Sequence, residues 1–197
     1  MNEAKLDFLK ELANIGTGHA TTALSQMLSG KLFQLVVPEA RLLPFTEAAQ
    51  YVGGLEQVVV GIFIVVSGDV GGHMAFMLPY DSAMHLVRLL TGDDSGEVNE
   101  LALSALQELG NIMITSYLNA LSKMTNLLMA PSIPGVAVDM AGAVWESVLA
   151  GAEVISEVTV IRTEFFADGE AIEGNIIFLP DQEDFDKIAR ILGLEEM

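Results

Sequence analysis

The same sequence pattern occurs twice along this chain of 197 residues, and this repetition limits the possible folds more than any other feature. Three polar residues at spacing i, i+4, i+7 recur 97 positions later: Asp7, Glu11 and Asn14 form the first triplet, and Ser104, Glu108 and Asn111 form the second. A proline follows each triplet, Pro38 after 23 intervening residues and Pro134 after 22. Near the end of each half, Pro79 is matched by Pro180. The chain therefore predicts two copies of one structural unit.

The spacing within each triplet is that of one face of a helix. At 3.6 residues per turn, positions i, i+4 and i+7 lie within a stripe roughly 60° wide. The residues expected on the opposite, apolar side are Phe8, Leu9, Leu12 and Ile15 in the first helix, and Leu106, Leu109, Ile112 and Met113 in the second. We therefore expect both helices to bury their apolar side and to display their triplets to solvent.

A plainer interpretation is that these are ordinary amphipathic helices whose outer faces happen to be polar. Asparagine argues against it, because its side chain competes with the backbone for hydrogen bonds and makes it a mediocre helix former. Asn14 and Asn111 nevertheless occupy the same position in both copies. The sequence thus favours two copies of one displayed polar site.

Each half predicts a long helix, an extended strand, a β-hairpin and a shorter helix, with the acidic segment 93–97 as the link. The expected ranges are 6–29, 32–43, 58–66 with 73–78, and 81–92 in the first half, then 99–125, 133–140, 158–165 with 171–179, and 181–192 in the second. Asp81 is expected to cap its helix, and Asp168-Gly169 is a strong hairpin turn signal. Residues 141–155 fit either an apolar helix or a continued strand.

Antiparallel strands with helices between them, and no βαβ rhythm, indicate an α+β fold. We expect a single domain of two repeats, about 1–97 and 98–197, that form an internally duplicated, pseudo-two-fold antiparallel sheet with two long motif-bearing helices.

Composition excludes several classes of function. The formal charge of −18, from 27 acidic and 9 basic residues, opposes binding to nucleic acid or to an anionic membrane. The longest apolar run, at 58–66, is far shorter than the roughly 20 residues that span a bilayer, so no membrane insertion is expected. The chain contains no cysteine, which excludes disulfides and thiolate catalysis, and its amino end lacks a signal-peptide pattern. We expect a cytoplasmic, monomeric protein.

The chemistry of the triplets is that of positioning. An asparagine amide neither gains nor loses a proton near neutral pH, but it donates and accepts hydrogen bonds, so it can orient a water molecule. In phosphoryl transfer the protein's contribution is mainly positioning and charge stabilisation. Neither triplet has a cationic clamp, a phosphate loop or a set of metal ligands beside it in the sequence. If the chemistry is phosphoryl transfer, the metal and the lysine must come from the substrate.

The two triplets, the prolines that follow them and the Asn-Ile-Gly and Asn-Ile-Met continuations resemble the CheC family of phosphatases, which act on the phosphorylated chemotaxis regulator CheY. The resemblance covers essentially the whole chain with both motif copies complete, whereas the related CheX has one copy. It implies that Asn14 and Asn111 each enter the regulator's active site to orient water, while Glu11 and Glu108 pair with its lysine. The spacing to Pro38 is one residue longer than in the family, at a position that shapes only the scaffold.

Other polar residues give weaker signals. Gly16-Thr-Gly18 superficially resembles a phosphate loop, but it lies inside the helical pattern and favours close packing of the backbone. The three histidines are isolated from one another, so no metal site is expected. Asp139 is expected to point outward from a strand that buries Val136, Val138 and Met140. The CheC family also binds the receptor deamidase CheD, and Asp139 is a candidate for that contact.

The leading hypothesis is a phosphatase for the aspartyl phosphate of CheY, with no cofactor bound by this chain and Mg²⁺ in the CheY substrate site. One alternative is a non-catalytic adaptor that binds phospho-CheY and CheD. Another is a flagellar switch module like FliY, which has an additional carboxy-terminal domain. Because the sequence ends at Met197, soon after the last repeated element, we expect the CheC-like role over the FliY-like one.

Overall fold

The structure is a computed structural model that describes residues 3–27, 33–52, 54–149, 157–167 and 170–191. The elements of the first half are α1 (Glu3–Met27), β1 (Phe33–Pro44), α2 (Phe45–Tyr51), β2 (Val58–Gly68), β3 (Gly72–Pro79) and α3 (Tyr80–Thr91). Those of the second half are α4 (Glu100–Thr125), β4 (Met129–Pro131), β5 (Gly135–Met140), α5 (Ala141–Leu149), β6 (Glu157–Ala167), β7 (Glu170–Pro180) and α6 (Gln182–Ile191). The two halves thus share one order of elements, except that β1 is continuous and its counterpart is divided into β4 and β5.

The strands form one antiparallel sheet in the order β1-β6-β7-β3-β2, with β4 and β5 both pairing with the far side of β2. The first strand of each half pairs with the hairpin of the other half, because β1 lies beside β6 and β5 lies beside β2. Neither half therefore completes its own sheet. The predicted α+β fold with a pseudo-two-fold antiparallel sheet is confirmed, and this exchange of strands is how the two halves interlock.

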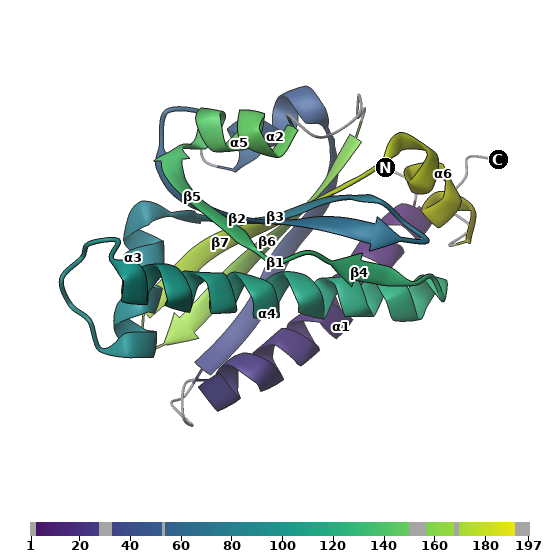
Figure 1. Ribbon diagram of the computed structural model, residues 1–197. Helices are drawn as coiled ribbons and strands as arrows, with labels where there is room; N and C mark the ends of the chain where they lie inside the picture. The colour runs from purple at the N-terminus through teal and green to yellow at the C-terminus, as the bar shows by residue number, and fades with distance from the viewer. Residues whose placement is uncertain (1–2, 28–32, 53, 150–156, 168–169, 192–197) are drawn as a thin grey trace.

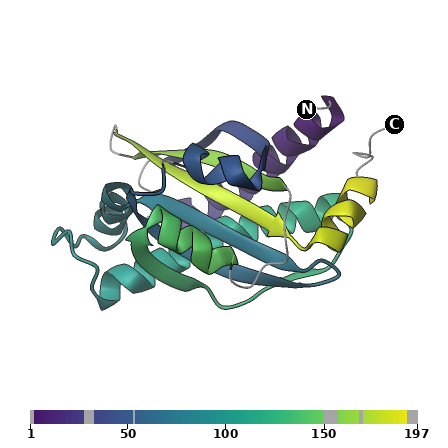
Figure 2. The same ribbon diagram turned by 90° about the horizontal axis from the view of Figure 1, so that it is seen from above.

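Helices cover both faces of the sheet (Figure 1). On one face, α1 and α4 enclose the larger core, which includes Leu12 and Leu24 of α1 and Leu106, Leu109 and Met113 of α4. On the other face, the shorter α2 and α5 lie over a smaller core, as the turned view also shows (Figure 2). The motif-bearing helices consequently form one outer layer of a three-layer molecule.

Most of the predicted elements are present. The four long strands and the two long helices lie where the sequence predicts them, and 141–149 is the helical alternative of the ambiguous segment. The turn at Asp168-Gly169, the end of the first helix at 28–29 and residues 150–155 lie outside the described residues.

Two local predictions were wrong, and one short helix was missed. Asp81 does not cap α3, because Pro79 occupies the N-cap position without a side-chain hydrogen bond and Asp81 lies within the first turn. Helix α2, a single short helix directly after Pro44, was not predicted. The extended segment 133–140 begins later than expected, because the chain bends at 132–134 between β4 and β5.

The structure shows no helix with the length and apolar character needed to span a membrane, among the residues it describes.

Candidate functional site

The triplets lie on the outer sides of α1 and α4. Glu11 and Asn14 are exposed, as are Ser104 and Glu108, and Asn111 is half-buried. The side chain of Asp7 lies outside the described part of the chain, although its backbone belongs to α1. On the opposite sides of the helices, Leu12, Leu106, Leu109 and Met113 are buried, and Phe8, Ile15 and Ile112 pack at the edge of the same core. The side chain of Leu9 is not described. The predicted inward orientation of the apolar residues is confirmed for those that can be seen.

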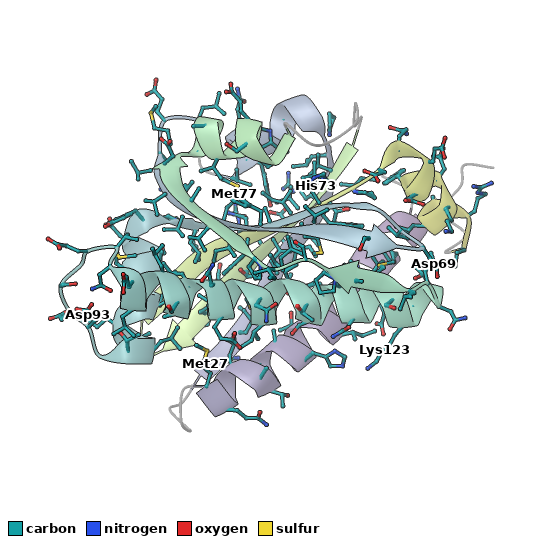
Figure 3. All side chains as sticks on the ribbon, viewed as in Figure 1. Met27, Asp69, His73, Met77, Asp93 and Lys123 are labelled. Carbon is teal, nitrogen blue, oxygen red and sulfur yellow. The ribbon has the colours of Figure 1, made fainter. Side chains whose placement is uncertain are left out.

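The two long helices cross obliquely and run in opposite directions. Met27 at the end of α1 and Lys123 near the end of α4 lie on opposite sides of the view (Figure 3). The triplets occupy the amino-terminal halves of these helices, so they lie toward opposite sides of the layer. The chain therefore presents two separate candidate sites, each built from one helix.

Helix α4 is fixed firmly at its start and against the sheet. The side chain of Asn99 caps it by accepting a hydrogen bond from the backbone N–H of Ala102 at 2.9 Å. Gly110, which precedes Asn111, allows a close approach, because a Cβ there would lie 2.3 Å from Cγ2 of Ile62 on β2. These contacts fix the height and rotation of the helix, and hence the direction in which Asn111 points.

The side chain of Asn111 has one neighbour on its own helix. Its Oδ1 accepts a hydrogen bond from the hydroxyl of Thr115 at 3.4 Å, one turn further along. That distance is long for a hydroxyl donor, so the bond favours one orientation of the amide but does not use all of its hydrogen-bonding capacity. Among the described residues, the amide N–H₂ group and one lone pair of Oδ1 have no further hydrogen-bond partner, so a binding partner or a water molecule can use them.

The prolines that follow the triplets have different environments. Pro38 lies in β1, at a bulge where the register with β6 shifts between Val36 and Glu39. Pro134 lies in the bend between β4 and β5, and its carbonyl accepts a hydrogen bond from Nε2 of Gln107 at 3.2 Å. Gln107 directly precedes Glu108, so the bend is attached to α4 beside the second triplet.

Contacts between the helices hold the triplets in a fixed relation. The hydroxyl of Tyr117 on α4 lies 3.0 Å from the hydroxyl of Thr17 on α1. Burial raises the pKa of Tyr117 to about 12, partly offset by this hydrogen bond, so the phenol is neutral at physiological pH. Near the surface, Nζ of Lys123 lies 3.3 Å from Nε2 of His19 (Figure 3). Sequence reasoning did not find Gln107 or Tyr117, because both act through partners distant in sequence.

Asp139 is exposed on β5, and its carboxylate accepts a hydrogen bond from the backbone N–H of Met140 at 2.7 Å. The expectation that Val138 and Met140 are buried was wrong: they are 36% and 51% exposed. They lie toward the end of an edge strand, where the helical layer covers only Val136. The edge strand β5 is therefore partly apolar on its surface.

No metal centre is evident in the described ranges, which contain no group of three or more His, Asp or Glu side chains placed to hold an ion. The segment 16–18 lies within α1, and Gly16 contacts Tyr117, as expected for close packing of the backbone.

The chain is thus an α+β protein with one antiparallel sheet and two long helices, each of which carries a glutamate and an asparagine on its outer side. The sequence profile of the CheC-like family matches residues 5–38 and 101–137, which contain both triplets. The chain is 36% identical to a Bacillus subtilis (strain 168) protein named CheY-P phosphatase CheC, over 98% of this chain and 96% of that protein. It therefore belongs to the CheC-like family.

Solved structures share the fold. Thermotoga maritima FliY superimposes with a TM-score of 0.75 at 18% identity, over 100% of this chain and 99% of that one. A chain from the CheX-CheY-BeF3-Mg+2 complex of Borrelia burgdorferi superimposes with a TM-score of 0.54 at 13% identity, over 86% of this chain and 97% of that one. At these identities, the likeness establishes the architecture.

Proposed function

We propose that this chain is a cytoplasmic protein phosphatase that hydrolyses the aspartyl phosphate of a CheY-type response regulator. One observation carries the proposal: each half presents a glutamate and an asparagine one helical turn apart, Glu11 with Asn14 and Glu108 with Asn111, on the outer side of a long helix. The name of the Bacillus relative supports the proposal, since that protein aligns over nearly the whole chain.

Asparagine performs the positioning step. When the helix docks on the phosphorylated regulator, the side-chain amide of Asn14 or Asn111 holds a water molecule in line with the phosphorus. The water oxygen forms a bond to phosphorus while the bond from phosphorus to the aspartyl oxygen breaks. The regulator recovers its carboxylate, and both protons of the water leave with inorganic phosphate.

The regulator supplies the remaining groups. Glu11 and Glu108 each form a charge-assisted pair with a lysine beside the phosphorylated aspartate, which orients the helix face. Mg²⁺ belongs to the substrate, where it neutralises charge on the phosphoryl oxygens. The Borrelia complex brings together CheX, CheY, BeF3 and Mg²⁺, and one of its chains has a similar fold, which supports this division of the site.

Phosphate release from phosphorylated CheY tests the proposal. Asn14→Ala and Asn111→Ala should each lower the rate while the protein stays folded, because exposed substitutions usually change stability by less than about 0.5 kcal/mol. The double variant should be inactive. Asn119→Ala is the matched control, since Asn119 is an exposed asparagine on α4 outside the triplet. If the double variant bound phospho-CheY normally and kept most of its activity, the water-orienting role would be wrong.

A non-catalytic role is the main competitor. As an adaptor or a FliY-like module, the chain would use its triplets only to bind the regulator. The same assay separates these roles, because an adaptor would bind phosphorylated CheY without accelerating loss of its phosphate.

A second partner fits the edge strand β5. Asp139 projects from it next to Met140, which is half-exposed, and an edge strand offers unpaired backbone groups to another protein. We propose that CheD binds at this edge. Asp139→Lys should abolish copurification with CheD while leaving phosphate release by the protein alone unchanged, and an unaltered CheD interaction would place that contact elsewhere.

A further inference from the structure

The bend between β4 and β5 presents an isoleucine to solvent. Ile133 is 90% exposed, although the backbone on both sides of it is held in place. The N–H of Ser132 donates to the carbonyl of Val65 at 2.9 Å, and the N–H of Val65 donates to the hydroxyl of Ser132 at 3.0 Å. On the other side, Gln107 holds the carbonyl of Pro134. The apolar side chain is thus displayed by a fixed backbone.

The bend lies beside the second triplet. Gln107, which holds it, is three residues after Ser104 and so lies about 60° from Ser104 around α4, on the same flank as Asn111. Leu101, which is 54% exposed, precedes Ser104 by three residues and so lies about 60° from it on the opposite flank, that of Glu108. The second triplet therefore has an exposed aliphatic side chain on each flank.

Among the described residues, the first triplet has no exposed aliphatic side chain at the position that matches Ile133. The residue before Pro38 is Val37, the counterpart of Ile133, and it packs against the larger core. The difference arises because β1 continues through this region, paired with β6 on both sides of its bulge, whereas the second half bends. The counterpart of Leu101 in the first helix is Ala4. The repeated triplet thus has different surroundings in the two halves of the chain.

We infer that Ile133, together with Leu101, is an apolar docking contact for the phosphorylated regulator at the second site only. This inference rests on the proposed function and adds a determinant of affinity to it. The contact requires an apolar surface on the regulator beside its phosphorylated carboxylate. A chain with a formal charge of −18 repels that acidic region, and contacts between apolar groups offset the repulsion without depending on charge.

The experiment measures the two sites separately. In the Asn14→Ala background, turnover comes from the second site, and Ile133→Ser should raise the KM for phosphorylated CheY about tenfold while kcat stays unchanged. In the Asn111→Ala background, turnover comes from the first site, and Ile133→Ser should change neither constant. A general loss of folding would reduce activity in both backgrounds, so the contrast isolates the contact.

Leu128→Ser provides the matched control. Leu128 is 68% exposed just beyond the end of α4, about 26 Å along the helix from Glu108, and its replacement should leave both backgrounds unchanged. An equal effect of Ile133→Ser in the two backgrounds, or an effect no larger than that of Leu128→Ser, would overturn the inference. Failure of the proposed function would be seen without any change at Ile133, as full turnover by the double variant Asn14→Ala/Asn111→Ala. That result would overturn the proposed function and this inference together.

Discussion

The ring of Tyr117 on α4 fills the space in which any side chain at Gly16 on α1 would begin. A Cβ at Gly16 would lie 2.5 Å from Cδ1 of this ring, which is nearer than such atoms can approach. Tyr117 is buried, so its ring has little room to move away. This contact sets the separation of the two helices, and Gly16 follows Asn14 by only two residues. The position of the first triplet therefore depends on a glycine outside it.

Gly16→Ala should destabilise the protein by about 1–3 kcal/mol, because the added methyl group forces the helices apart. Gly18→Ala is the matched control: a Cβ there meets no atom within 4 Å, and alanine is preferred over glycine in a helix. It should stabilise by up to about 1 kcal/mol. Urea denaturation of both variants checks the pair, and a stabilising Gly16→Ala would contradict the close contact.

Tyr117 should make stability fall at alkaline pH. The pKa of Tyr117 in the folded protein is about 12, above the roughly 10 of an unfolded tyrosine. Its contribution to the free energy of unfolding is therefore complete below pH ~10 and is lost as the pH rises toward 12. The loss amounts to no more than roughly 3 kcal/mol. Tyr117→Phe should lower the free energy of unfolding by about 1 kcal/mol at pH 7, because the hydrogen bond with Thr17 is lost. Above pH 10, the stability of this variant should fall less than that of the unmodified protein.

Unfolding free energies measured from pH 8 to 11.5 test this difference. Thr17→Val is the control, because it removes the same hydrogen bond and keeps the ionisable ring, so it should retain the alkaline decline. Parallel curves for Tyr117→Phe and the unmodified protein would show that the phenol does not titrate as the burial of Tyr117 requires.

Local patterns in the sequence predicted the elements that depend on neighbouring residues. The periodicity of Leu106, Leu109 and Met113 predicted the buried side of α4, and the cap at Asn99 lies where the helix was expected to begin. The hairpins follow from apolar segments on either side of short polar turns. Each of these patterns spans only about a dozen neighbouring residues, so it can be recognised in a single sequence.

Features that depend on contacts between the two halves could not be predicted in this way. The pairing of β1 with β6 and of β5 with β2 joins segments more than 70 residues apart, and no local pattern specifies it. The bend at Ile133 arises from the hydrogen bonds of Ser132 with Val65. Because the repeats have similar sequences, the pattern suggested equal sites, while the contacts at Val37 and Ile133 make their surroundings different.

Glu108→Gln and Glu11→Gln should weaken engagement of the regulator's lysine, since the charge is lost while shape and helix propensity are kept. Each is measured with the other site disabled by replacing its asparagine. We expect affinity for phosphorylated CheY to fall several-fold, with a smaller effect at high salt. Glu146→Gln is the control, because Glu146 is exposed on α5 across the sheet. A change silent in both binding and turnover would eliminate the proposed ion pair.

Mg²⁺ should be required for turnover although this chain alone binds none. A magnesium ion needs convergent oxygen ligands in nearly octahedral geometry. The first triplet offers two carboxylates and an amide, and the second offers one carboxylate, a hydroxyl and an amide, in each case spread along a single helix. The phosphorylated carboxylate of the regulator provides such ligands, so the active site is assembled from two proteins. Calorimetric titration of Mg²⁺ into the chain alone should give no stoichiometric binding, while chelation should stop phosphate release from the mixture. Tight binding to the chain alone that is lost in Glu11→Gln or Glu108→Gln would instead indicate a self-contained metallophosphatase.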